Sequence, residues 1–224
     1  MKRAVYIGLV VLLALFALQA GATELLQNGS FQTGDFTDWT LGTTQYGTAG
    51  AGYPIVGQWP LDSGINAWVG NVGDATDEYR GYQGATLSQV FTAPGLGIET
   101  FSIDLAAKNV PGYYQLEAGL FLLLVDGNTI GSFDIGELAP NQLFTGSLSA
   151  TAALSAGQHT FEIAVERDAT TDENTPLQFV TDASIDYQVP EPTSLVLMAS
   201  GGLGIAGILR RKLFYGKSVP MSAQ

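Results

Sequence analysis

Apolar and polar positions alternate repeatedly between residues 24 and 188, with the period of two that a half-buried strand shows. The stretch FSIDLA is the clearest, because Phe101, Ile103 and Leu105 fall on one face while Ser102 and Asp104 fall on the other. Helical periodicity is hard to find in the same region. The predicted strands are 25–31, 39–42, 65–70, 85–92, 99–107, 114–125, 129–134, 142–149, 159–167 and 177–187.

Turn residues separate these strands. Pairs such as Asn28-Gly29, Pro94-Gly95 and Asp126-Gly127 favour tight turns. Short strands joined by such turns are typical of an all-β, antiparallel β-sandwich. Residues 23–188 are long enough for one domain with a substantial core.

The stretch LFLLLV at 120–125 is apolar on both faces of a strand. Six residues are too few to cross a bilayer. We predict a central strand that is covered on both sides. The alternative is an apolar sheet face that contacts a partner.

The N-terminus has the three parts of a secretory signal peptide. Met1-Lys2-Arg3 is positively charged, residues 4–18 are uncharged and apolar, and Ala20-Gly21-Ala22 supplies the small residues that signal peptidase requires. We therefore predict a signal helix in residues 1–22, removed before Thr23.

A second apolar segment lies near the C-terminus. Residues 193–209 carry no charge and would make a helix of about 25 Å, just enough to span a bilayer. Pro190, Glu191 and Pro192 precede it in a stiff, extended segment. The cations that follow it favour the cytoplasmic side; they are Arg210, Arg211 and Lys212. A short cytoplasmic tail, 213–224, completes the chain, and a plain membrane anchor is the alternative interpretation.

These parts, in this order, resemble the PEP-CTERM sorting signal of Gram-negative bacteria, which we place at residues 189–212. The resemblance implies that Pro190-Glu191-Pro192 is recognised by an integral-membrane exosortase. It also implies that Arg210, Arg211 and Lys212 hold the segment in the inner membrane until processing. The protein would then reach the cell surface or the extracellular matrix, in bacteria that often make exopolysaccharide. We expect the mature protein to lack residues 210–224.

The composition excludes several classes of site. The chain has no cysteine, so disulfides, thiol catalysis and thiolate metal sites are ruled out. Residues 23–192 keep three basic residues against all 21 acidic ones, a net charge of −18. Such a surface repels phosphate backbones, so nucleic acid is not an expected partner. Neutral sugars, Ca²⁺ and basic proteins remain compatible with it.

The order of local patterns also carries a resemblance. The stretches NGSFQTGDFTDWTL, ATLSQVFTAP, ETFSIDLAA and FVTDASIDY are similar to strands of jelly-roll modules in the galactose-binding-like and carbohydrate-binding superfold. Several such modules hold a structural Ca²⁺ between the first and last strands. The resemblance implies that Asn28 and Asp182 would be its ligands, although Gln32 stands where an acid is common. No other cofactor is expected.

Aromatic residues in predicted loops are the candidates for sugar binding, because their rings stack on pyranose faces. Trp39 and Trp68 lie in strand contexts and are assigned to the core. Arg80 is expected to pair with Asp77 or Glu78. The candidate ligand-binding residues are Tyr53, Trp59, Tyr79, Tyr82, Tyr113 and Tyr114.

Catalysis finds little support in the sequence. His159 opens a predicted strand without a serine or carboxylate motif around it. Glu162 and Glu166 share one strand face, but four residues along a strand place them about 13 Å apart, too far for one scissile bond. We expect a non-enzymatic binding or structural protein of the exopolysaccharide or biofilm. A secreted polysaccharide hydrolase is the alternative.

Overall fold

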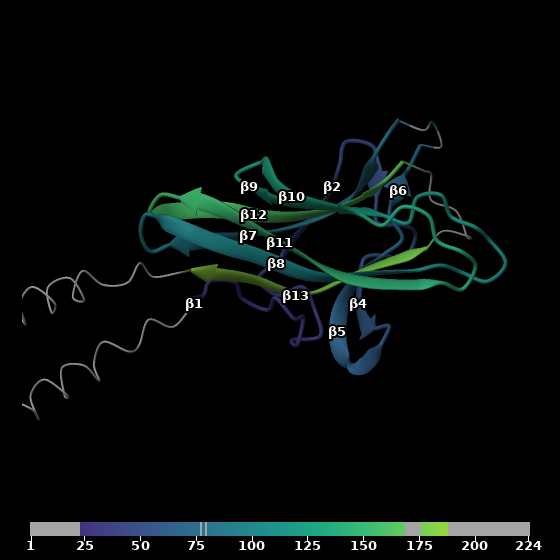
Figure 1. The fold of residues 1–224 in the computed structure, drawn as a ribbon, viewed down its shortest axis with the longest axis horizontal. Helices are drawn as coiled ribbons and strands as arrows, with labels where there is room; N and C mark the ends of the chain where they lie inside the picture. Colours follow the sequence, from purple (N-terminus) through teal and green to yellow (C-terminus); the bar gives the residue numbers. More distant parts are fainter. Residues whose placement is uncertain (1–22, 77, 79, 169–175, 188–224) are drawn as a thin grey trace, which may run out of the picture. The chain divides into compact units, whose positions relative to one another are not determined.

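The computed structural model describes residues 23–76, 78, 80–168 and 176–187. The predicted signal peptide and sorting signal lie outside the described residues. Residues Ala22–Gln188 form one compact unit. Within the described part the secondary structure is strand, and no helix there is long and apolar enough to cross a membrane. Figure 1 shows two layers of strands packed face to face.

Most of the strands belong to two antiparallel sheets. One sheet has the order β11-β8-β13-β5-β4, with β1 added to β13, and the other has the order β10-β9-β12-β7-β2. A short ladder joins β3 to β6. The strands are β1 Thr23–Glu24, β2 Thr40–Thr43, β3 Gly47–Thr48, β4 Ile55–Trp59, β5 Asp62–Gly70, β6 Gly73–Asp74, β7 Gln83–Ala93, β8 Gly97–Lys108, β9 Leu120–Val125, β10 Asn128–Asp134, β11 Leu143–Leu154, β12 Gly157–Arg167 and β13 Leu177–Tyr187.

The chain crosses repeatedly between the two sheets. From β5 onward, β5, β8, β11 and β13 fall in one sheet, while β7, β9, β10 and β12 fall in the other. This interleaving of antiparallel strands is the jelly-roll topology. The predicted fold class, an all-β jelly-roll sandwich, is confirmed.

The space between the sheets is filled by the side chains that the alternation predicts. On β8, Phe101, Ile103 and Leu105 are buried while Ser102 and Asp104 stay partly exposed. Strand β12 does the same with a second set of alternating residues, since Phe161, Ile163 and Val165 are buried. Trp39 and Trp68 also lie in the core, as predicted.

Strand β9 is central in its sheet, between β10 and β12. Phe121, Leu123 and Val125 are buried, whereas the alternate leucines are only partly buried. The prediction of a strand covered on both sides therefore holds for the core face only, because the outer leucines stay partly exposed. Glu162 and Glu166 of β12 stand beside the outward leucines.

The largest departures from the predicted strands occur at loops. Only β1 lies near 25–31, because Asn28 and Phe31 adopt positive φ angles of 51° and 53° that end an extended strand. Residues 114–119 form a loop before β9. Strand β4 was not predicted. It forms a hairpin with β5 whose apolar side chains pack over one outer sheet face with Phe179.

Candidate functional site

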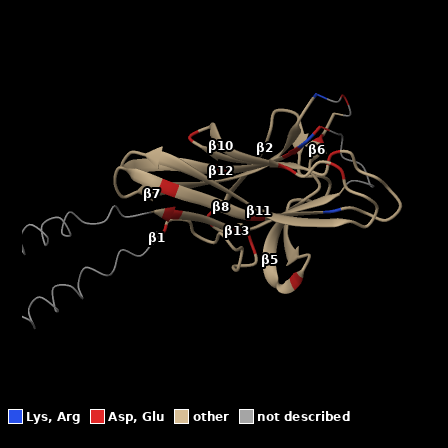
Figure 2. Cartoon of the chain, in the orientation of Figure 1, with Lys and Arg blue, Asp and Glu red and all other residues tan. Residues whose placement is uncertain are grey.

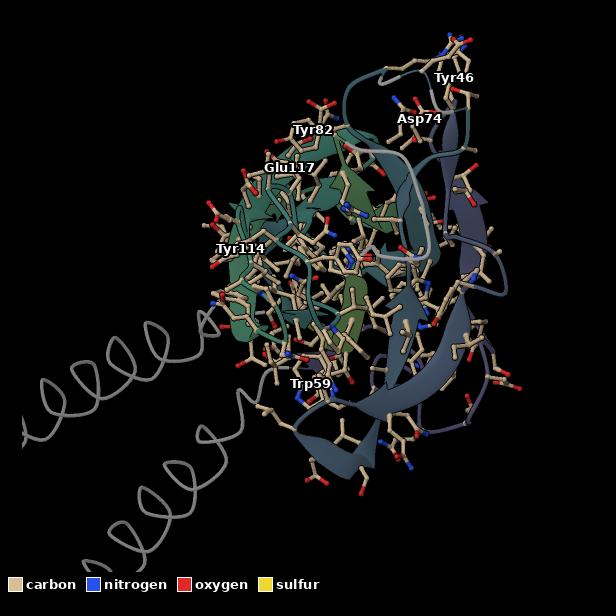
Figure 3. The ribbon with its side chains drawn as sticks, turned by 90° about the vertical axis from the view of Figure 1, so that its right-hand side faces the viewer. Tyr46, Trp59, Asp74, Tyr82, Tyr114 and Glu117 are labelled. Atoms are coloured by element: carbon tan, nitrogen blue, oxygen red, sulfur yellow. The ribbon has the colours of Figure 1, made fainter. Side chains whose placement is uncertain are left out.

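Exposed aromatic residues gather where loop 109–119 joins β8 to β9. Tyr113 is 50% exposed, Tyr114 68% and the neighbouring Leu116 75%. Tyr82, which precedes β7, is 37% exposed, and its hydroxyl donates a hydrogen bond of 3.3 Å to an oxygen of Glu117. We call these five residues the tyrosine patch. Figure 3 shows Tyr82, Glu117 and Tyr114 along one side of the domain.

The buried side chain of Asn109, which is 2% exposed, holds the exposed loop through hydrogen bonds. Its amide nitrogen lies 2.7 Å from the carbonyl oxygen of Tyr113 and 3.0 Å from those of Leu138 and Ala139. Its amide oxygen accepts a bond of 2.8 Å from the backbone of Val110. One side chain therefore fixes the backbone that carries the two adjacent tyrosines.

Arg167, the last residue of β12, fastens the other end of the loop. This arginine is only 1% exposed. Its Nε donates to the carbonyl oxygen of Glu117 at 2.8 Å, and its two terminal nitrogens reach Val72 O at 3.2 Å and Gln115 Oε1 at 3.3 Å. A rigid guanidinium with several donors suits this task, because it bonds the loop at two places and the segment at Val72 at the same time.

Gln178 of β13 completes the anchorage. It is fully buried, donates to Ala118 O at 2.8 Å and accepts from Val72 N at 3.0 Å. Buried polar groups that are satisfied in this way hold a backbone in one arrangement. The loop therefore presents its aromatic rings from a fixed support, which lowers the entropic cost of binding.

Tyr82 keeps its proton in this setting. Burial raises the pKa of the Tyr82 phenol, and the nearby Glu117 carboxylate raises it further. Because the Tyr82 hydroxyl donates its only hydrogen to Glu117, the phenol oxygen and the carboxylate both present hydrogen-bond acceptors to a ligand. Such a pair matches the hydroxyl groups of a sugar better than it matches an anion.

A neighbouring turn is organised around Asp74, which is 1% exposed. Hydrogen bonds from the hydroxyl and backbone of Thr76 lower the pKa of Asp74, and the backbone N–H of Arg80 adds a bond of 3.1 Å. The Arg80 side chain pairs with Glu78 and lies 4.2 Å from the ring centre of Tyr46. The predicted pairing of Arg80 with an acidic neighbour is confirmed.

Two other candidate aromatics are buried or partly buried. Trp59 is the last residue of β4, not a loop residue, and is only 8% exposed. Its ring meets Phe179 edge to face with centres 6.4 Å apart. Assigning Trp59 to a binding loop was therefore wrong, because the β4–β5 hairpin buries it. Tyr53 is partly buried against the core, and Tyr79 lies outside the described residues.

The two residues assigned to calcium lie on adjacent segments, since Ala183 N donates to Gly29 O at 3.0 Å. Asn28 already uses its side chain within its own loop, donating to Asp35 O and Thr37 O and accepting from the backbone of residue 33. Its amide closes the loop.

Asp182 is exposed in a bulge of β13, with φ of +47°. It lines an open pocket of about 260 Å³ together with Glu24 and Ser184. One Glu24 oxygen already accepts bonds from Leu26 N and Ile185 N. Among the described residues no three histidine or carboxylate side chains converge as metal ligands.

His159 and the two strand glutamates lie away from the tyrosine patch. The His159 ring bonds Asp126 at 2.7 Å and Ser155 O at 2.9 Å, and the Asp126 bond raises the pKa of the imidazole. This histidine lies near the start of β12, whereas Arg167 ends that strand. Burial, followed by the charge of Glu162, raises the pKa of Glu166.

The sequence pointed to the three tyrosines of the patch but not to the buried polar side chains that hold the loop in place. Asn109, Arg167 and Gln178 looked unremarkable in the sequence. The only available signals were an isolated arginine in an acidic domain and the Asn-Val-Pro-Gly turn that begins with Asn109.

Comparisons with known proteins give one sequence match and several structural ones. Residues 188–212 match the PEP-CTERM protein-sorting motif, and no curated protein matches the chain. TmCBM61, solved in complex with β-1,4-galactotriose, is 16% identical with a TM-score of 0.45, over 73% of this chain and 97% of that one. The CBM22-1 xylan-binding domain of Paenibacillus barcinonensis Xyn10C is 14% identical with a TM-score of 0.41, over 76% and 97%.

A family 35 carbohydrate-binding module from Clostridium thermocellum is 13% identical with a TM-score of 0.37, over 74% of this chain and 98% of that one. At these similarities none of the three structures indicates a ligand for this chain. The sequence match is more informative, because it covers the predicted sorting segment and implies an exported protein. The chain thus carries a PEP-CTERM sorting motif at 188–212, after a jelly-roll β-sandwich.

Proposed function

We propose that this protein is an exported, non-catalytic polysaccharide-binding protein of the cell surface or matrix. The tyrosine patch carries the proposal. It places two exposed aromatic rings on a loop that buried polar side chains hold in place, and a third ring, Tyr82, beside the Glu117 carboxylate of that loop. This combination of stacking surfaces and directed polar groups suits a pyranose chain.

The charge of the domain narrows the ligand to neutral polysaccharide. Residues 23–192 hold three basic residues against 21 acidic ones, and Arg80 and Arg167 are engaged within the protein. The third, Lys108, is exposed where β8 meets loop 109–119, and one cation is too little to offset the repulsion that an anionic polymer would meet from a net charge of −18. Neutral sugars avoid this cost, and Glu117 accepts hydrogen bonds from their hydroxyl groups.

Affinity electrophoresis of the full-length chain through gels containing neutral polysaccharides tests the binding. The double change Tyr113→Ala and Tyr114→Ala should weaken retention at least about tenfold, because it removes two stacking surfaces. Leu96→Ala is the matched control, since Leu96 is 78% exposed between β7 and β8, at the other end of both strands from the patch. Equal retention of the double variant, or no retention of the unchanged protein on any gel, would refute the proposal.

Delivery is the second part of the proposal. Signal peptidase would remove residues 1–22, and an exosortase would recognise Pro190-Glu191-Pro192 in the inner membrane of a Gram-negative cell. Arg210, Arg211 and Lys212 would hold the segment on the cytoplasmic side until processing. The match at residues 188–212 supports this route, and a polysaccharide-binding domain suits a place in exopolysaccharide or biofilm.

Mass spectrometry of the exported form tests the delivery. The mature protein should lack residues 210–224, and Glu191→Ala should leave the intact C-terminus in the membrane fraction. An exported protein that retains Gln224 would overturn this part and leave a membrane-anchored sandwich. The mass-spectrometry result does not depend on the gel retention, so delivery and binding can fail separately.

A further inference from the structure

Strand β11 is a long, uncharged edge. It pairs with β8 over all 12 of its residues without a register shift, and no other strand of the described residues pairs with it. Its sequence LFTGSLSATAAL has no charged residue and no proline. Figure 2 shows the acidic residues elsewhere on the domain. Edge strands are usually protected by charge, proline or bulges, and β11 has none of these.

The free backbone groups of β11 follow from its ladder. The carbonyl oxygen of Gln142 accepts a hydrogen bond from Asn109 N, so the backbone polar groups of even-numbered residues point toward β8. In an antiparallel ladder the residues alternate, and the odd-numbered positions from Leu143 onward turn their N–H and C=O groups to the open edge. The side chains at 145, 147, 149 and 151 are exposed on the outer sheet face.

The edge is self-complementary. The sequence TGSLSAT at 145–151 reads almost the same in both directions, with Leu148 at its centre. A second copy related by a two-fold axis through Leu148 would set Ser147 against Ser149 and Thr145 against Thr151. This register pairs odd positions with odd positions, so the free backbone groups meet. Cross-strand Ser and Thr pairs are also favourable.

Charge favours this edge over other surfaces as the meeting point of two copies. Residues 23–192 carry a net charge of −18, so two domains repel one another over most approaches. A charge-free strand of 12 residues avoids close contact between like charges. The occupant that fits best is therefore a second β11.

We propose that two copies of this chain join their sheets by antiparallel pairing of β11 with β11, centred on Leu148. The inference does not depend on the polysaccharide-binding function. Each interface would be closed by the two-fold axis, so it would produce a dimer and not a fibre.

Analytical ultracentrifugation of the full-length chain in density-matched detergent tests the pairing. The unchanged protein should reach twice the monomer mass as its concentration rises. Ser147→Pro removes an edge N–H without touching the β8 ladder, and Ser149→Glu places two carboxylates beside the two-fold axis. Each change should weaken dimerisation at least about tenfold. Thr92→Glu, at an exposed position of β7 in the other sheet, is the matched control and should leave it unchanged.

Cysteine cross-linking tests the register, since the natural chain has no cysteine. Under mild oxidation, a mixture of Thr145→Cys and Thr151→Cys chains should form a disulfide dimer. Either chain alone should not, because equal positions would lie about 20 Å apart along the paired strands. A monomer at every concentration, or a dimer that persists in both Ser147→Pro and Ser149→Glu, would overturn the proposal. So would cross-linking of Thr145→Cys alone.

Discussion

Glu99 is a carboxylate whose surroundings conflict with a charge. It lies on the core side of β8 and is 0% exposed, and among the described residues neither of its oxygens has a hydrogen-bond partner. In the sheet it is flanked by Ala152 and Tyr187. Burial raises the pKa of Glu99, and nearby backbone N–H groups and the charge of His159 offset this only in part.

Replacing Glu99 by methionine should therefore stabilise the protein at neutral and alkaline pH. The unfolded carboxyl ionises above its ordinary pKa, near 4.3, while the folded one resists ionisation. The wild-type protein thus loses stability as pH rises from about 4.3 through the raised pKa. A buried polar group without partners costs about 1–3 kcal/mol, so Glu99→Met should gain about that much at pH 8.

Thermal melts at pH 4 and pH 8 measure the gain. In a domain of this size about 1 kcal/mol moves the midpoint by about 2–4 °C, so the pH 8 midpoint should rise by about 2–12 °C. The rise at pH 4 should be smaller, because the cost of ionising the buried carboxyl is absent there while the cost of burying the neutral carboxyl without partners remains. Glu137→Met, at an exposed position, controls for the loss of one negative charge. An equal shift at both pH values, or none at pH 8, would refute the reasoning.

Three further predictions concern other polar groups. His159→Gln should lower the free energy of unfolding by about 0.5–1 kcal/mol at pH 5 and by almost nothing at pH 9, because the attraction to Asp126 is lost as pH rises through the raised pKa of the imidazole. Urea midpoints at the two pH values measure this loss, and an equal loss at both would contradict the prediction. Asn109→Ala should cost about 1–3 kcal/mol in urea unfolding and also weaken gel retention, and unchanged retention would mean that the loop needs no such support. Millimolar Ca²⁺ should leave the melting midpoint unchanged, because the side chain of Asn28 is already engaged in hydrogen bonds within its own loop. A Ca²⁺-dependent rise of the midpoint that disappears in Asp182→Asn would instead support the calcium site.

The sequence predicted those parts of the fold that depend on local pattern. Alternation along β8 and β12 is visible in a few consecutive residues, and the structure buries the expected faces. The β4–β5 hairpin was missed because its packing is not local. Trp59 sits among glycine, glutamine and proline, and it becomes a buried residue only when Phe179, far along the chain, lies beneath it.

The same distinction applies to the candidate site. Tyr113 and Tyr114 follow a Pro-Gly turn, so their exposure could be predicted from neighbouring residues. The support beneath them could not. Arg167 reaches the loop from 50 residues away, and nothing in the local sequence distinguishes a buried bridging arginine from an exposed one.

The tyrosine patch and the β11 edge together predict a property that neither has alone. Strand β11 begins at the patch end of the domain, since Leu143 pairs with Lys108 just before loop 109–119. Antiparallel pairing about Leu148 would reverse the second copy, so the two patches would face opposite ends of the dimer. Such a dimer could bind two polysaccharide chains and cross-link them, with avidity that the monomer lacks.

Cross-linking is separable from binding by one variant. Ser147→Pro leaves the patch intact, so it should retain monomer affinity for a neutral polysaccharide in electrophoresis while losing the ability to raise the viscosity of a dilute solution of it. The unchanged protein should raise the viscosity most when the number of patches is near the number of binding segments on the polysaccharide. Excess protein should raise it less, because each polysaccharide segment then holds its own dimer and two polysaccharide chains no longer share one. Equal thickening by Ser147→Pro would mean that the patches, if they bind, are joined by another surface.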